Sequence, residues 1–171
     1  LGRMHKKLEK PLVEMGCNPM AQGQVQRSEL LKRFSLSDSG VLFGTDSFWE
    51  GVDVRGRALE HVIITRLPFR VPTEPLQEAR LEDLSARGIN AFSHYTVPQA
   101  VLRFKQGFGR LVRSKTDRGV VSVLDQRILT KRYGKVFLET LPEVDCFASS
   151  ASAVVKRVED FFKATGKAAE Q

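Results

Sequence analysis

Hydrophobic residues recur at helical spacing in several segments of the chain. The longest of these segments begins near Pro98, a residue type favoured in the first turn of a helix, and is expected to run through Arg113. Leu102 is the one apolar residue outside its core-facing side, which is made of Val97, Val101, Phe104, Phe108 and Leu111. Shorter patterns predict helices over residues 4–15, 29–34, 76–88 and 153–162. Gly16 is expected to end the first of these, and Ser28 to cap the second.

Short runs of consecutive apolar residues predict strands that are buried on both faces. Such runs lie at residues 41–43 and 120–124, while further strands are expected at residues 61–67 and 144–147 and a short extended segment at residues 20–21. Because they alternate with helices, the expected fold class is α/β, with a mainly parallel sheet and helices on both of its faces. Ligands bind such sheets beyond the carboxyl ends of the strands. Thr45 and Asp125 follow two of these ends and are therefore candidate site residues.

Length and composition fit one globular domain. The chain has 171 residues, of which 42% are hydrophobic, so we expect a single domain over residues 1–171, with a frayed tail at 164–171. Because the sequence opens directly on a helix, we expect a fragment of a longer protein. No apolar run approaches the ~20 residues of a membrane span, and no signal peptide is recognisable. A cytoplasmic protein without a membrane partner is expected.

Cysteine and histidine residues form no metal-binding pattern. Cys17 and Cys146 lie far apart, without C-x-x-C spacing, which supports neither a zinc site nor an iron–sulfur cluster in this chain. Two buried free thiols in a reducing cytoplasm are favoured, and a disulfide stays open. The histidines share no ligand spacing and are interpreted as structural or exposed; they are His5, His61 and His94.

Positive charge concentrates around the longest helix. The net charge is +7, which fits polyanion partners but is also common among ordinary domains. Between residues 103 and 118 a single acid, Asp117, stands against six basic residues: Arg103, Lys105, Arg110, Arg113, Lys115 and Arg118. This local excess favours a binding site over a general contribution to solubility.

The polar side of this helix carries the main candidate site. Gln106, Arg110 and Arg113 are spaced i, i+4 and i+7, opposite the core-facing residues. Two arginines on adjacent turns repel, so this stripe suggests an anionic ligand, and planar guanidinium donors suit phosphate oxygens. A solvated basic face is the alternative. Gly107 and Gly109 count against it, because each costs a helix ~1 kcal/mol relative to alanine, which suggests that something must approach closely there.

A complete nucleotide site is missing from the sequence. A P-loop requires G-x-x-x-x-G-K-[ST], and the nearest stretch has Gly51 and Gly56 followed by Arg57 and Ala58. The chain can supply charge stabilisation, but it has nothing to hold a nucleotide and its magnesium unaided. An enzyme acting on a phosphorylated metabolite is disfavoured, since no candidate base or nucleophile is recognisable.

Two segments resemble motifs of superfamily 2 helicases. Residues 106–113, QGFGRLVR, resemble motif VI, Q-x-x-G-R-x-x-R, and residues 44–54 resemble motif V. Together with the LPF sequence at residues 67–69, they are similar to the DinG branch of the DinG/XPD helicases. The resemblance implies the second, C-terminal motor domain of such a helicase, with a RecA-like three-layer fold. The first motor domain would carry the Walker motifs and, in many relatives, an iron–sulfur cluster.

The resemblance also implies roles at a nucleotide cleft. Arg110 and Arg113 would act as arginine fingers toward the γ-phosphate of ATP, bound with Mg²⁺ on the first domain. Such fingers are worth ~10³–10⁵ in rate. Gln106 would orient the phosphate or the attacking water. The residues expected to couple nucleotide state to DNA are Glu50, Gly51, Asp53 and Gly109. Alternatively, the two acids among them merely pair with the arginines.

The same resemblance implies a grip on single-stranded or forked DNA. The hydroxyl and backbone amide of Thr45 would contact a phosphate, although the hydroxyl can equally cap a turn. Trp49 and Phe48 could stack on bases, worth ~1–3 kcal/mol per base, or at least one of them could pack in the core. The other candidates for DNA contact are Ser47, Arg66, Arg70 and Lys115.

The leading hypothesis is therefore the second motor domain of an ATP-driven DNA helicase, which works with the first motor domain of the same polypeptide. By itself this chain should neither hydrolyse ATP nor unwind DNA. The alternative is a non-catalytic nucleic-acid-binding module that uses the basic helix alone.

Overall fold

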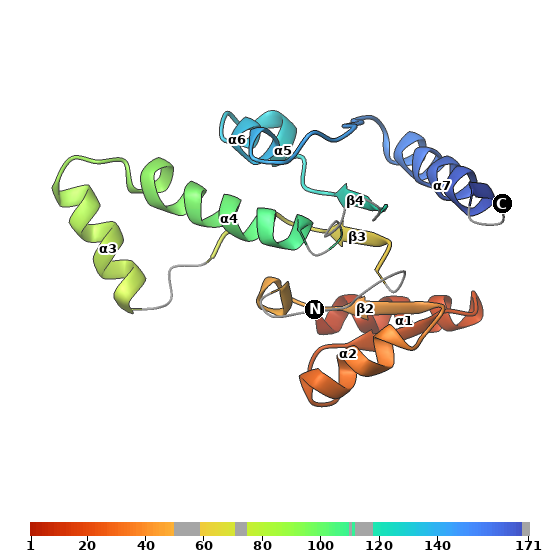
Figure 1. Cartoon of the computed structure of the whole chain (residues 1–171). Helices are drawn as coiled ribbons and strands as arrows, with labels where there is room; N and C mark the ends of the chain where they lie inside the picture. Colours follow the sequence, from red (N-terminus) through yellow and green to blue (C-terminus); the bar gives the residue numbers. More distant parts are fainter. Residues whose placement is uncertain (50–58, 71–74, 110, 112–117, 169–171) are drawn as a thin grey trace. The chain divides into compact units, whose positions relative to one another are not determined.

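The computed structural model describes residues 1–49, 59–70, 75–109, 111 and 118–168. Its contacts group the chain into two compact units, Leu1–Thr140 and Leu141–Gln171, and the single domain expected from its length stays a prediction. Figure 1 traces the helices and strands of both units. Among the described helices, none combines the length and the apolar character that crossing a bilayer requires.

The N-terminal part of the first unit is organised around a parallel strand pair. Its elements are α1 (Gly2–Glu14), β1 (Asn18–Ala21), α2 (Arg27–Ser35), β2 (Gly40–Phe43) and the 3₁₀ helix η1 (Asp46–Trp49). β1 and β2 pair in register from Asn18↔Gly40 to Ala21↔Phe43. α2 packs against both strands, and the buried side chains form one hydrophobic cluster of Met20, Leu30, Phe34 and Phe48.

The first two helices differ in how well their ends were predicted. α1 ends just before Gly16, whose φ of +79° is a left-handed conformation that favours glycine, so the predicted stop is confirmed. The predicted cap of α2 is wrong. This helix begins at Arg27, its N-cap is Gln26, and no side chain caps it. Ser28 therefore lies inside the first turn instead of ahead of it.

A second parallel pair joins β3 (His61–Ile64) to β4 (Val120–Val123), in register from His61↔Val120 to Ile64↔Val123. Both strands lie where they were predicted, but each ends earlier than the predicted range. In the part of the chain that the structure describes, the two pairs are separate two-stranded sheets. Parallel strands that alternate with helices agree with the expected α/β class.

Helices contributed by the middle of the chain build the core beside the second strand pair. They are α3 (Pro75–Ala86), the π-helix η3 (Phe92–Thr96), α4 (Val97–Phe108), α5 (Arg127–Thr130) and α6 (Gly134–Glu139). α4 contacts α6, where the buried rings of Phe104 and Phe137 meet edge to face at 5.4 Å. The predicted core-facing residues of α4 and Leu111 are all buried, and Leu102 is exposed, so this face is confirmed.

The second unit contains α7 (Ala151–Ala168), which extends beyond the predicted end at residue 162. The strand predicted at residues 144–147 is wrong, since this segment lies in no strand. Its side chains contact α7 instead: Arg157 pairs with Asp145 at 2.8 Å, and its guanidinium lies 5.9 Å from the ring centre of Phe147. Most of the tail expected at 164–171 is helical, and residues 169–171 lie outside the described residues.

Candidate nucleotide and nucleic-acid interface

Gln106 lies in the last turn of α4 and is exposed, on the side opposite the buried face. α4 ends at Phe108, and Gly109 is its C-cap. The amide of Leu111 donates to the carbonyl of Phe108 at 3.0 Å, which closes a turn. A continuous helix through Arg113 was therefore a wrong prediction. Arg110 and Arg113 themselves lie outside the described residues, so their positions stay a prediction.

Glycine explains the early end of α4. Gly107 is buried in the last turn and Gly109 caps it, and glycine favours the helical backbone less than any residue except proline. A side chain added at Gly109 would place its Cβ 3.3 Å from the carbonyl oxygen of Lys105, within the turn itself. The expected close approach of a ligand at these glycines stays a prediction.

Thr45 follows β2 and is exposed, as expected for a residue at the carboxyl end of a strand. Its backbone amide donates to Oε1 of Gln22 at 2.9 Å, and its hydroxyl donates to the same oxygen at 3.0 Å. These are the two donors assigned to a DNA phosphate, so a glutamine oxygen occupies the place expected for a phosphate oxygen. Gln22 directly follows β1, so the pairing of the segment expected at residues 20–21 with β2 would have indicated this neighbour.

The 3₁₀ helix η1 lies near the start of the segment that resembles motif V, residues 44–54. It packs against α4. Phe48 is 6% exposed and belongs to the core cluster, which confirms core packing for one of the two aromatic candidates. Arg27 of α2 anchors this turn. Its Nη2 donates to the carbonyl of Phe48 at 3.2 Å, and its guanidinium lies 5.1 Å from the centre of the Phe48 ring. The beginnings of both motif segments therefore lie on elements in contact.

The remaining candidates divide into described and undescribed residues. Arg66 and Arg70 follow β3 and are exposed. The backbone of Ser47 and Trp49 forms part of η1, whereas their side chains are outside the described structure. Four further candidates lie entirely, backbone and side chain, outside the described residues: Glu50, Gly51, Asp53 and Lys115. The roles expected for this second group stay predictions.

Asp125 follows β4, as predicted, and binds groups from two other segments. Its side chain is 8% exposed. Oδ2 accepts the backbone amide of Leu67 at 2.9 Å and Nη2 of Arg127 at 2.6 Å. The Arg127 guanidinium also lies 5.4 Å from the ring centre of Phe69. Asp125 thus ties the LPF segment, which follows β3, to the end of β4.

Hydrogen bonds from the Arg127 guanidinium, supported by the backbone amides of Leu67 and Arg127, hold the pKa of the Asp125 carboxyl well below its ordinary value. The same carboxylate raises the pKa of Arg127. Asp125 therefore remains ionised and engaged near neutral pH, which suits a structural acceptor better than a general base. The D-x-R spacing of this pair was visible in the sequence and was missed.

The histidines take structural or exposed positions. His5 is buried beside Phe43, with ring centres 5.3 Å apart. Burial lowers the pKa of His61, whose Nε2 lies 2.8 Å from Oγ of Ser122.

Both cysteines are free, with Cys17 partly buried and Cys146 exposed, so the prediction that both thiols are buried is wrong. An iron–sulfur cluster takes four ligands, and the chain contains 2 cysteines, so its residues do not fit one. Within the described residues, no group of His, Cys, Asp and Glu could hold a metal ion.

Residues 1–144 match the family of the helicase C-terminal domain. The chain belongs to this family. The match covers the whole first unit, including both strand pairs and α4, and it agrees with the resemblance of the two motif segments. The buried face of α4 and the η1–α4 contact are thus features of a helicase C-terminal domain.

Named relatives specify the type of helicase. The chain is 49% identical over 123 residues to the ATP-dependent DNA helicase YoaA of Haemophilus influenzae, covering 72% of the chain and 19% of the relative. It is 44% identical over 144 residues to the 3'-5' exonuclease DinG of Bacillus subtilis, covering 83% of the chain and 16% of that relative. It is 46% identical over 123 residues to the ATP-dependent helicase DinG of Mycobacterium tuberculosis, covering 72% of the chain and 18% of that relative. The expected DinG-type resemblance is confirmed, and the chain spans less than a fifth of each relative.

Proposed function

We propose that this chain is the second motor domain of an ATP-dependent DNA helicase of the DinG type. The observation that carries this proposal is the family match over residues 1–144, together with relatives named as ATP-dependent DNA helicases. The proposal includes a RecA-like three-layer arrangement of parallel strands and helices, and a first motor domain of the same polypeptide that binds ATP with Mg²⁺.

In this function Arg110 and Arg113 approach the γ-phosphate bound on the first domain and stabilise the charge that develops during phosphoryl transfer. Gln106 orients the phosphate or the attacking water. Its exposed place at the end of α4, opposite a buried apolar face, supports this role because a rigid helix can hold an amide toward a partner domain. The groups that couple this cleft to DNA are Glu50, Gly51, Asp53 and Gly109.

On the DNA side, the chain grips one strand of single-stranded or forked DNA through phosphate contacts and base stacking. The contact of η1 with α4 supports coupling between DNA binding and the nucleotide cleft, because a displacement of one element would also displace the other. The residues proposed for the DNA contacts are Thr45, Ser47, Trp49, Arg66 and Lys115.

The decisive experiment uses the protein in which this chain is joined to its first motor domain. Arg113→Ala should lower DNA-stimulated ATP hydrolysis by about 10³-fold or more, with an unchanged thermal unfolding midpoint. Arg87→Ala is the control, because Arg87 is an exposed arginine that pairs with Asp83 at 2.9 Å, outside the motif segments. Normal turnover in the Arg113 variant would refute the assignment.

The alternative, a non-catalytic nucleic-acid-binding module, is favoured only by the cluster of basic residues between 103 and 118. It predicts tight single-strand binding and no ATP hydrolysis when the chain is joined to the preceding domain. DNA-stimulated hydrolysis by the joined protein would exclude it.

A further inference from the structure

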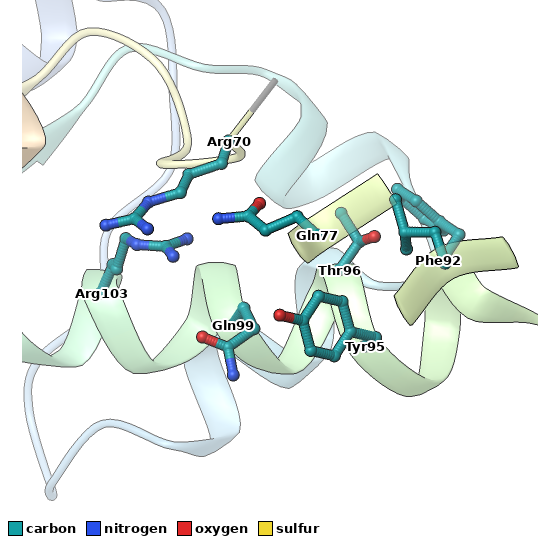
Figure 2. A pocket seen from close by; sticks show the side chains of 8 residues that line it. Arg70, Gln77, Phe92, Tyr95, Thr96, Gln99 and Arg103 are labelled. Atoms are coloured by element: carbon teal, nitrogen blue, oxygen red, sulfur yellow. The ribbon is translucent and has the colours of Figure 1, made fainter. Parts of the chain in front are cut away.

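A pocket of ≈ 220 Å³ opens in the first unit, between the segment after β3 and the helices α3, η3 and α4. Figure 2 shows Arg70 and Arg103 at one end of this pocket and the ring of Phe92 at the other. Each of the two arginines, and Gln77 beside them, already has an interaction partner in the structure. The groups that can serve a ligand are therefore sought at the aromatic end.

Four residues at the aromatic end come from one continuous helical segment. Phe92, Tyr95 and Thr96 belong to η3. Gln99 lies in the first turn of α4, which follows η3 directly. The spacing i, i+3, i+4 and i+7 is that of one helical side, and all four side chains line the pocket. η3 is a π-helix, a type of turn that frequently occurs at functional sites. Two rings, a hydroxyl and an amide thus face one small space.

Both rings are held in place and keep surface for a further contact. Phe92 stacks on Phe69, with ring centres 5.9 Å apart, and is still 46% exposed. Nη1 of Arg80 donates to the hydroxyl of Tyr95 at 3.4 Å, and its guanidinium lies 6.0 Å from the Tyr95 ring centre. Tyr95 is half-buried. Rings that are fixed in advance lose little conformational freedom when a flat ligand stacks on them.

The polar groups beside these rings are available for hydrogen bonds. Within the described part of the chain, neither the side-chain amide of Gln99 nor the hydroxyl of Thr96 has a hydrogen-bond partner. An amide offers two donor hydrogens and an acceptor oxygen, and a hydroxyl both donates and accepts. Single-stranded bases are recognised by this combination, in which aromatic rings stack on the base and polar side chains bond its edge.

The size of the pocket fits one base. Pockets that take whole small molecules measure about 300–1,000 Å³, and this one is smaller. A base that turns into the pocket leaves its sugar and phosphate outside, as flipped bases do in the pockets of enzymes that modify them. The site therefore needs no phosphate contact from the arginines at the other end.

We propose that this pocket binds one base of single-stranded DNA, which stacks on Phe92 and Tyr95 and bonds the amide of Gln99. The proposal rests on the proposed helicase function and adds a base contact outside the motif V segment. Gln106 follows Gln99 by seven residues, on the same side of α4. One helix therefore connects the bound base to the candidate nucleotide cleft.

The test measures the affinity of the joined protein for oligo(dT) across a salt series. Gln99→Ala should weaken binding about 2- to 10-fold, the effect of one lost hydrogen bond. Phe92→Leu should weaken it about fivefold, the lower end of what one stacked base contributes. The slope of log affinity against log salt concentration should stay unchanged in both variants, because neither loses a phosphate contact.

An oligonucleotide made only of abasic sugar-phosphate units separates the base from the backbone. At low salt, both pocket variants should bind it within twofold of the unaltered protein, because it contains no base to lose. If Gln99→Ala weakens binding of the abasic strand as much as binding of oligo(dT), the change acts through the helix and the proposal is wrong.

Gln26→Ala and Phe147→Leu are the matched controls, and their affinity for oligo(dT) should stay within twofold. Gln26 is exposed and makes no capping hydrogen bond, and Phe147 is 51% exposed in the second unit. Gln99→Ala decides the test even if Phe92→Leu is less stable, since alanine favours a helix. A Gln99 variant that matches its control, at an unchanged thermal midpoint, overturns the proposal.

A second readout is the affinity for ATP without DNA, which should not change in either pocket variant. If ATP binding weakens and oligo(dT) binding does not, the pocket takes the base of the nucleotide and the proposal is wrong.

The two proposals fail in distinguishable ways. If the unaltered protein binds no oligo(dT), the proposed DNA grip fails and the pocket proposal fails with it. If it binds oligo(dT) and hydrolyses ATP normally, while the pocket variants match their controls, only the pocket proposal fails.

Discussion

The side-chain amide oxygen of Gln22 accepts hydrogen bonds from both the backbone amide and the hydroxyl of Thr45. A carbonyl oxygen and a phosphate oxygen accept hydrogen bonds in similar geometry, but the phosphate carries charge and binds the same donors more strongly. If Thr45 contacts DNA, then bound phosphate must displace Gln22, and the energy of these two hydrogen bonds is subtracted from the affinity. In that case Gln22 would both position the Thr45 donors and compete with the phosphate for them.

Removing this competitor should strengthen DNA binding. We expect Gln22→Ala in the joined protein to raise the affinity for oligo(dT) by about 3- to 10-fold, since a net hydrogen bond is worth about 0.5–1.5 kcal/mol. Fluorescence anisotropy measures this change. Gln26→Ala is the matched control, because Gln26 is exposed and its side chain makes no capping hydrogen bond. A weaker affinity in the Gln22 variant would mean that positioning of Thr45 outweighs competition.

At the scale of elements, Asp125 connects the start of α5, two residues away, to the residues after β3, which lie 58 positions earlier in the sequence. Its partners Arg127 and Phe69 continue into an aromatic cluster, with Tyr133 5.4 Å and Phe137 5.8 Å from Phe69. A change in this carboxylate should therefore affect the packing of α6 as well as the local turn.

We expect Asp125→Asn to lower the free energy of unfolding by about 1–2 kcal/mol at pH 7. The amide keeps an acceptor for Leu67 but loses the charged bonds to Arg127, which is 41% exposed and partly screened by solvent. Urea denaturation measures the difference. Because folding lowers the pKa of Asp125, its contribution is complete above the unfolded-state value of about 3.9 and declines as the pH falls below it. The gap between the two proteins should therefore be smaller near pH ~3 than at pH 7; an equal gap would contradict this account.

Periodicity predicted the elements that bury a regular face. The core-facing side of α4 follows the helical spacing and is buried throughout. Four-residue strands give a weaker signal. β1 contains Pro19, yet pairs with β2 through the rest of its backbone, whereas residues 144–147, for which a strand was also expected, pack against α7 instead. Pairing partners, which sequence spacing does not contain, decide between these outcomes.

The candidate site, too, was predicted where local patterns suffice and not where the partners lie far apart in the sequence. Thr45 and Asp125 follow parallel strands as predicted, because that expectation depends only on where the strands end; contact of either residue with a ligand stays a prediction. Their partners Gln22 and Leu67 lie in the segments that follow the neighbouring strands β1 and β3, so local patterns could not indicate them. Helical spacing placed Gln106 correctly on the exposed side of α4 but extended the helix too far, since two glycines end it early.

At the scale of the whole molecule, the two units differ in what stabilises them. The first unit contains both strand pairs and the fully buried Phe104 and Phe137. The second contains α7, in which the ring centres of Phe161 and Phe162 lie 5.4 Å apart and Arg157 contacts Asp145 and Phe147. The family match, which ends at residue 144, coincides closely with the boundary between them.

We therefore expect a chain shortened to residues 1–140 to unfold cooperatively, with a thermal midpoint within about 4 °C of the 171-residue chain, a shift that corresponds to about 1 kcal/mol. Differential scanning calorimetry measures both midpoints. A chain shortened to residues 1–126 is the control. It lacks α5 and α6, and with them Phe137, which is 0% exposed against Phe104. Removing a buried phenylalanine alone costs about 3–5 kcal/mol, so this control should lose the cooperative transition. If the 1–140 chain loses it too, the second unit is required for the fold of the first, and the boundary at Thr140 does not separate independently stable parts.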